Sequence, residues 1–174
     1  MTEAFTRDAN NVPITTDGLT SKDSQTFSGN NTTVYVPIFS ITGTVEIRGL
    51  WGVVTTTMGV NHTAAYFRLN DQGAQVAITA ASGVTLSGLA VGTTIVKKGV
   101  AATAVTLLDN AAGRVSEPTT LETPFFSPFV VMKKTGAATN IEYVYSTTDN
   151  PTTGAMTFYV RWLPVSLDGS IAAL

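Results

Sequence analysis

The most regular alternation of hydrophobic and polar positions lies in residues 41–57, which read ITGTVEIRGLWGVVTTT. A period of two predicts a β-strand, because successive strand residues point to opposite faces. One set of alternate positions is apolar along its whole length: Val45, Ile47, Gly49, Trp51 and Val53. The other set begins polar and turns apolar at Leu50 and Val54, so we expect a second layer or a neighbour to cover that face too.

Two glycines, Gly49 and Gly52, flank Trp51 within this strand. Glycine inside a strand marks a bulge, a bend or the close approach of another group. We therefore expect the strand to curve at this point. We also expect Trp51 to pack in one core with Trp162, which ends a later strand.

Turn-forming residues separate several further short strands. These are predicted at residues 33–39, 64–69, 75–79, 93–98, 104–108, 129–133, 141–147 and 155–163. The short polar links at 70–73 and 148–154 predict a hairpin between the strands on either side of each. No stretch shows a helical period, so helix should be sparse.

This pattern predicts an all-β fold, an antiparallel β-sandwich. The number of strands is best matched by a jelly-roll-like sandwich, while a single sheet or a barrel stays open as an alternative. At 174 residues the chain is of a size for one domain, which we assign to residues 32–174.

Residues 1–31 form a polar, turn-rich segment without a helical or strand period, and we predict an extended N-terminal arm. Its isolated apolar residues are Phe5, Val12, Ile14, Leu19 and Phe27. A disordered terminus is one interpretation. The spaced apolar residues favour the other, a segment that becomes ordered on a neighbouring subunit.

The composition adds an expectation of assembly. Charged residues make up 13% of the chain, against about 25% in an average domain, and threonine is abundant. So few charges suit a protein that hides much of its surface in an oligomer.

Charge and residue content also exclude some partners. The net charge of −2 and the scattered basic residues argue against direct nucleic-acid binding. The chain has no apolar stretch near the ~20 residues that span a bilayer and no leader pattern at its start, so we expect no membrane association. It also has no cysteine, which rules out disulfides and thiolate metal sites.

Two further stretches stand out. Residues 117–129 combine three prolines with Phe125, Phe126 and Phe129, which we expect in the core or in a subunit interface; an exposed patch for a partner or a sugar is the alternative. Paired lysines at 97–98 and 133–134 end apolar strands, and we expect them to be solvated features of strand edges.

Catalytic chemistry finds little support. A Ser-His-Asp triad would have to use His62, the only histidine, and no nucleophile-elbow motif occurs. A glycosidase pair would have to come from Glu117, Glu122, or Glu46 with Glu142. We predict no catalytic, cofactor-binding or metal-binding residues, no cofactor, and no enzymatic activity.

Three stretches together resemble small structural proteins of tailed-bacteriophage virions, in particular capsid decoration (cement) proteins. They are GVVTTTMGVNHTAAYFRLNDQGAQVAIT at 52–79, GTTIVKK at 92–98 and EPTTLETPFFSPFVVMKKTGAATNIEYVYSTTDNPTTGAMTFYVRWLPVSLDG at 117–169. The resemblance implies a homotrimeric sandwich on the capsid exterior, assembled in the host cytoplasm. It also implies that the protein binds between major capsid protein subunits and stabilises the shell.

Two alternatives stay open. A tail, baseplate or fibre component shares the strand-rich, weakly charged composition. A carbohydrate-binding module, from a different class of protein, would use the sandwich with Trp51 or Trp162.

Overall fold

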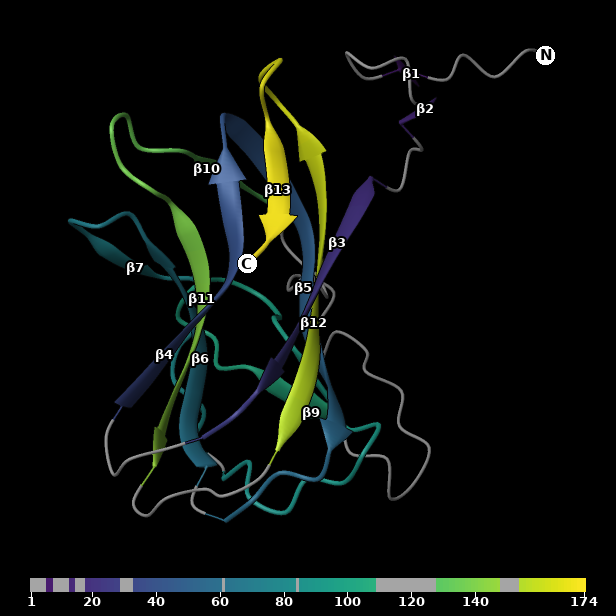
Figure 1. Cartoon of the computed structure of the whole chain (residues 1–174), viewed down its shortest axis with the longest axis vertical. Helices are drawn as coiled ribbons and strands as arrows, with labels where there is room; N and C mark the ends of the chain where they lie inside the picture. Colours follow the sequence, from purple (N-terminus) through teal and green to yellow (C-terminus); the bar gives the residue numbers. More distant parts are fainter. Residues whose placement is uncertain are drawn as a thin grey trace.

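Two antiparallel β-sheets pack face to face around one hydrophobic core (Figure 1). The computed structural model describes residues 6–7, 13–14, 18–28, 33–60, 62–83, 85–108, 128–147 and 154–174. The described residues form strands, turns and loops and no helix. The predicted all-β, antiparallel sandwich is confirmed.

The first sheet, called the β5 sheet, contains in spatial order β3 (Leu19–Thr26), β12 (Ala155–Pro164), β5 (Thr44–Thr56), β8 (Thr94–Val96) and β9 (Thr106–Leu108), with β10 (Phe129–Met132) also paired to β5. The second, the β11 sheet, contains β13 (Ser170–Ala173), β4 (Thr33–Thr42), β11 (Asn140–Thr147), β6 (His62–Asn70) and β7 (Gln75–Ala77). The short strands β1 (Thr6–Arg7) and β2 (Pro13–Ile14) pair with each other.

The long strand expected at residues 41–57 is two strands. Ile41 and Thr42 end β4 in one sheet, and β5 begins at Thr44 in the other. Between them Gly43 has a φ of 59°, a left-handed conformation that suits glycine. The chain thus crosses between the sheets at Gly43.

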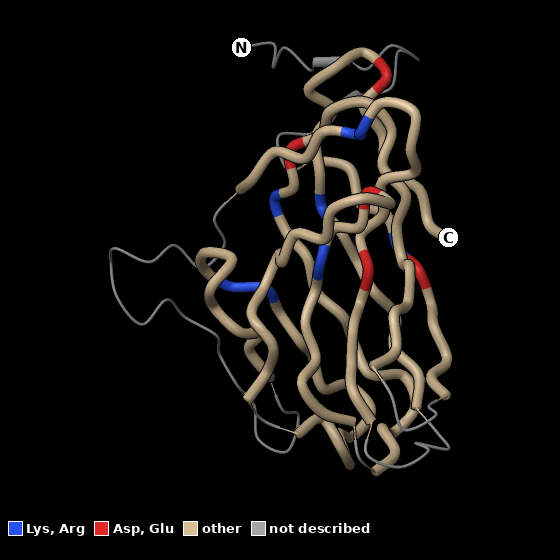
Figure 2. The backbone as a smooth tube through the Cα atoms, turned by 90° about the vertical axis from the view of Figure 1, so that its left-hand side faces the viewer, with Lys and Arg blue, Asp and Glu red and all other residues tan. Residues whose placement is uncertain are grey.

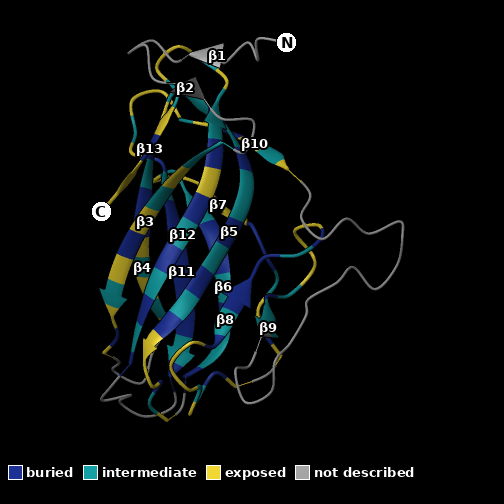
Figure 3. Ribbon diagram, turned by 90° about the vertical axis from the view of Figure 1, so that its right-hand side faces the viewer, coloured by how far each residue is buried: buried dark blue, intermediate teal, exposed yellow. Residues whose placement is uncertain are grey.

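A bulge in β5 changes which side chains face the core. Opposite β12, Arg161 pairs with Gly49 but the next residue, Trp162, pairs with Ile47, so Arg48 is an extra residue. The buried side of β5 therefore shifts after the bulge, and its members are Val45, Ile47, Leu50, Gly52 and Val54. Figure 3 shows the alternation of buried and partly exposed positions along the strand. The expected irregularity at Gly49 is confirmed, while the expected single apolar face is wrong.

The same shift separates the two tryptophans, which we had expected in one core. Trp162 is buried in the core at 6% exposure. Trp51 lies on the outer face of the β5 sheet, where its ring stacks on Tyr159 with centroids 5.4 Å apart. The prediction is wrong for Trp51 because the bulge turned its side chain outward.

Aromatic rings from both sheets fill one end of the core. Phe27, Phe67, Tyr143 and Phe158 pack together, and the Tyr143 and Phe158 ring centroids are 4.9 Å apart. Such offset and edge contacts favour aromatic pairs beyond the area they bury. The core therefore fixes how the sheets face each other.

Part of the predicted arm belongs to the sandwich. Residues 19–26 form β3, which pairs along its length with β12. Its inward positions include the polar Ser21, Asp23 and Gln25, so the strand lacks the apolar alternation that would predict it. The proposed boundary at residue 32 thus falls after the first strand of the β5 sheet.

One lateral edge of the sandwich is closed by hydrogen bonds between the sheets. The Ser21 hydroxyl donates to the Ile171 carbonyl at 2.7 Å, and Trp162 Nε1 donates to the Ser21 oxygen at 3.1 Å. These bonds join β3, β12 and β13. At the opposite edge the Ala80 amide, just after β7, donates to the Thr103 carbonyl at 3.1 Å, while β7 and β10 have no further partner among the described strands; we call this the open edge.

The two predicted hairpins have different outcomes. The link at 70–73 does join a pair of strands, β6 and β7. The link at 148–154 joins β11 to β12, which lie in different sheets, so this prediction is wrong. A short turn-prone sequence between strands does not distinguish a hairpin from a crossing between sheets.

Gly52 provides a test of core packing. A Cβ at this position would lie 2.9 Å from the Phe158 ring and from Met156 Cε, so Gly52→Ala should lower the free energy of unfolding by about 1–3 kcal/mol through overpacking. Gly83→Ala is the matched control, because no described atom lies within 4 Å of that Cβ. Urea denaturation measures both, and equal stabilities would contradict the packing.

Candidate functional site

An apolar groove of 390 Å³ lies at the open edge of the sandwich, and we call it the open-edge groove. Its lining comes from β6, β7, the residues that follow β7 and β8, and β10: Leu69, Val76, Ala77, Ile78, Lys97, Gly99, Val100, Ala101, Phe129, Val130, Val131 and Met132. Ile78 and Val131 are buried in its floor. The site is therefore built from elements of both sheets.

The groove exposes an unusual amount of apolar side chain. Val76 is 56% exposed, Val100 66%, Val130 61% and Met132 72%. These four are among the ten large hydrophobic side chains that are exposed in the described part of the chain. A contiguous exposed apolar patch marks an interaction site in a folded protein.

Two strand edges flank the groove. β7 pairs with β6, and β10 pairs with β5; neither has a second partner among the described strands. A free edge presents backbone donors and acceptors to which an extended segment can add as a further strand. The groove thus offers both apolar contact and backbone pairing.

Lys97 lines the groove and is buried, whereas the sequence predicted a solvated lysine. Its side chain is buried, with the residue 3% exposed, and Nζ donates to the Gly99 carbonyl at 2.6 Å. Nζ also lies 5.2 Å from the Phe129 ring centroid, within reach of a cation–π contact. Burial lowers the pKa of Lys97. The predicted solvated lysine pair at 97–98 is therefore wrong for Lys97.

A buried polar network on the outer face of the β11 sheet holds the β7 wall. Arg68 Nε donates to Glu142 at 2.6 Å, with side-chain exposures of only 6% and 7%. Arg68 Nη1 donates to Gln75 of β7 at 2.6 Å, and the guanidinium lies 3.9 Å from the Tyr35 ring centroid. These contacts anchor β7, whose own three residues are exposed.

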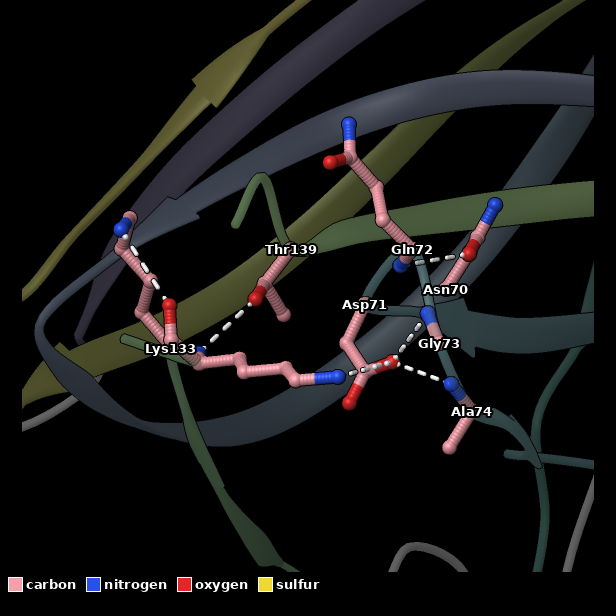
Figure 4. Close-up of polar contacts among 8 residues, drawn as sticks. Asn70, Asp71, Gln72, Gly73, Ala74, Lys133 and Thr139 are labelled. Atoms are coloured by element: carbon pink, nitrogen blue, oxygen red, sulfur yellow. Dashed lines mark hydrogen bonds and ion pairs between the residues drawn. The ribbon is translucent and has the colours of Figure 1, made fainter. Parts of the chain in front are cut away.

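A second set of polar contacts ties the β7 wall to the β10 wall (Figure 4). Asp71 accepts hydrogen bonds from the Gly73 and Ala74 amides and lies 3.6 Å from Lys134 Nζ. The bond from Ala74, with smaller effects of Gly73 and Lys134, lowers the pKa of Asp71. The link joins the β6–β7 turn to the β10–β11 turn and limits how far the walls can separate.

His62, the histidine considered for a triad, lies in the core at 0% exposure. Its Nε2 is 3.0 Å from the Tyr143 hydroxyl, and its ring stacks on Tyr145 at 4.0 Å between centroids. Burial lowers the pKa of His62 to about 4. The side chain packs among aromatic rings and does not line the open-edge groove.

Of the carboxylates considered for glycosidase chemistry, Glu46 and Glu142 are described and are not brought together. Glu46 lies on β5 with Arg48, and Glu142 lies on β11 with Arg68, in different sheets. Glu117 and Glu122 fall outside the described residues, as do Phe125 and Phe126.

The outer face of the β5 sheet carries a second, smaller hollow of 300 Å³ beside Trp51. Arg48, Arg161, Thr94 and Val96 are among the residues that line it. Trp162 is buried, so a carbohydrate-binding module could use only Trp51, and this hollow is where the sugar would bind.

Within the described ranges, no group of three or more His, Asp or Glu side chains could hold a metal ion. No helix in the part of the chain that the structure describes is long and apolar enough to cross a membrane.

The exposed strand edges and apolar rim could not be found from the sequence as a site. Val76, Val100 and Val130 resemble ordinary strand and turn residues there. The sequence did predict two elements of this region. One is the hairpin turn at 70–73, and the other is the strand at 129–133, which ends in a lysine pair.

Removal of one partner of the buried Arg68–Glu142 pair should be strongly destabilising. Glu142→Ala would leave Arg68 buried without its counter-charge, and we expect the free energy of unfolding to fall by about 3–5 kcal/mol. Glu46→Ala is the control, because the Glu46–Arg48 pair is 28% and 35% exposed and should cost at most about 1 kcal/mol. Similar losses for both variants in chemical denaturation would contradict the difference in burial.

His62 should make stability depend on pH. The pKa of His62 is about 4 in the folded protein against 6.5 for an unperturbed group, so the unfolded chain takes up a proton at a higher pH than the folded protein does. The contribution of neutral His62 to the free energy of unfolding is therefore complete above pH 6.5 and is lost as the pH falls toward 4. Full loss corresponds to about 3 kcal/mol. His62→Gln should lose less stability than the parent between pH 6.5 and 4 in urea denaturation. Parallel curves for the two proteins would argue against this role of His62.

Comparisons with protein-family models, with curated proteins and with solved structures found no match to this chain.

Proposed function

We propose that this protein is a structural component of a bacteriophage virion, which decorates the capsid and stabilises it by binding between major capsid protein subunits. The observation that carries the proposal is the open-edge groove, where Val76, Val100, Val130 and Met132 are exposed between two free strand edges. A surface of this kind suits lasting contact with another chain. The resemblance of residues 52–79, 92–98 and 117–169 to decoration proteins supports the choice of assembly.

The order of strands supports the finer fold assignment, a jelly roll. Numbered along the chain, its eight strands are β3, β4, β5, β6, β7, β8, β11 and β12. One sheet then holds the first, eighth, third and sixth of these, and the other holds the second, seventh, fourth and fifth. This order supports a double-sheet jelly roll. In this assignment β9, β10 and β13 are additions at the sheet margins.

The physical basis of capsid stabilisation is linkage. A protein that binds across two capsid subunits, and less well to either alone, opposes their separation by its binding free energy. A specific contact of this kind buries about 800 Å² on each partner. Few charges need to be desolvated by such a contact, since charged residues make up only 13% of the chain. In Figure 2 the charged positions of the described chain lie in the upper half of the view.

The remaining expectations belong to the same proposal: a homotrimer, on the capsid exterior, assembled in the host cytoplasm, without enzymatic activity, nucleic-acid or membrane partner. The arm contributes to binding in this proposal, although residues 19–26 of it already serve as β3.

The carbohydrate-binding alternative has one observation in its favour, the Trp51–Tyr159 pair on an outer sheet face. Its rings stack on each other at an interplanar angle of 11°, so each covers part of the other's surface. We favour the capsid function because the open-edge groove exposes more apolar side chain.

Virions that contain this chain provide the test. Imaging should place it on the outside of the capsid, and shells assembled without it should disrupt at a lower temperature, because the clamping contacts are missing. Shells reconstituted with the purified chain serve as the control and should regain the lost stability. Density confined to the tail, baseplate or fibre would replace the proposal with the tail alternative, and absence from the virion would end it.

A further inference from the structure

We propose that the open-edge groove binds the N-terminal segment, residues 1–17, of a second copy of this chain. The inference concerns the same groove as the proposed function and names a second copy of this chain as its occupant, so the capsid would then be bound by other surfaces of the oligomer. The occupant is an extended segment that adds to the free edges of β7 or β10 and places apolar side chains over the groove.

The groove needs an occupant with apolar side chains. Its rim residues are more than half exposed, yet the floor beneath them, with Ile78 and Val131, is continuous with the core. A strand laid across it would cover the rim and satisfy backbone groups of an edge at the same time. No described segment of this chain fills that position.

The first 17 residues have suitable chemistry. They carry Phe5, Val12 and Ile14, spaced by polar residues. Their charged side chains are three carboxylates, Glu3, Asp8 and Asp17, against the single Arg7. The segment is therefore acidic and sparsely apolar.

Three lysines follow residues of the groove in the chain. Lys98 follows the buried Lys97 of the lining, and Lys133 and Lys134 follow Met132 of the rim. Lys134 is exposed and Lys98 and Lys133 are partly exposed. An acidic segment along the apolar rim would pass near these lysines, of which Lys134 also lies 3.6 Å from Asp71.

The starting point of the segment favours a neighbour. β3, which the segment leads into, lies at the closed edge of the β5 sheet, and β12 and β5 separate it from β10. In Figure 1, β3 and β7 lie on opposite sides of the sandwich, and β1 and β2 stand beyond its end. In this structure Thr6–Arg7 pairs with Pro13–Ile14, so the segment has to open this pair to lie extended. Once extended, 17 residues reach about 55 Å, which is ample for an adjacent copy.

The contact that results is head-to-tail, since each copy gives a segment from one place and receives one at another. Such heterologous contacts repeat around a closed ring or along an open chain of copies. The expected trimer would be a ring of this kind, in which three segments fill three grooves.

Cross-linking tests the contact directly, because the natural chain contains no cysteine. One full-length population carries Ile14→Cys and another, with a tag of different mass, carries Val130→Cys; the two are mixed and oxidised. The matched control replaces Val130→Cys by Leu167→Cys, an apolar site that is 96% exposed and outside the groove. We expect a mixed cross-linked dimer in several-fold greater yield with Val130→Cys.

A second measurement does not depend on cysteine. The double variant Val130→Glu with Met132→Glu places carboxylates at two exposed rim positions, where they repel the acidic segment without disturbing the core. In sedimentation velocity the natural chain should be oligomeric and this variant monomeric, while Leu167→Glu should keep the oligomer.

Three results would overturn the inference: a monomeric natural chain, equal cross-linking at Val130 and Leu167, or an oligomer that survives the double variant. A chain with both Ile14→Cys and Val130→Cys that closes only on itself would also overturn it, by making the occupant the chain's own segment. No capsid is present in these experiments. Failure here therefore leaves the capsid proposal to be decided by imaging of virions.

Discussion

The pairing of β5 with β12 across the bulge at Arg48 is the constraint on which the rest of the structure depends. The extra residue turns Leu50, rather than Trp51, toward the core, so it decides what the core contains and what the outer face shows. It also coincides with a break on the other edge of β5, where β10 pairs with one half of the strand and β8 with the other. The open-edge groove lies beside that break, lined by β10 and by the residues that follow β8.

The two lateral edges of the sandwich are stabilised in different ways. At the closed edge, the Ser21 hydroxyl bridges strands of both sheets. At the open edge, the Ala80 amide donates to the Thr103 carbonyl at 3.1 Å and Asp71 lies 3.6 Å from Lys134, and both contacts join elements of the two sheets. The Arg68–Glu142 pair braces neighbouring strands within the β11 sheet. This arrangement keeps β7 and β10 in place while their outer edges stay without a partner among the described strands, so the groove is preformed.

Local patterns were sufficient to predict the class of fold and most strands, because alternation and turn residues are encoded nearby in sequence. They failed where the determining contact is distant. β3 was missed because Ser21 and Asp23 face inward at an edge, where hydrogen bonds replace apolar packing. Trp51 was placed on the wrong face because a bulge depends on the partner strand. The groove was not predicted, since exposure of Val130 follows only from which strands lack neighbours.

The position of β3 in the sheet also sets an order of events when the protein is made. β3 precedes every other strand of the β5 sheet in the chain, yet it pairs with β12, which ends only at Pro164. Contacts of such long sequence separation form late and slowly, because a long loop must close first. The first strand of the β5 sheet to leave the ribosome is thus the one that waits longest for its partner, and this sheet can be completed only when nearly all 174 residues have emerged.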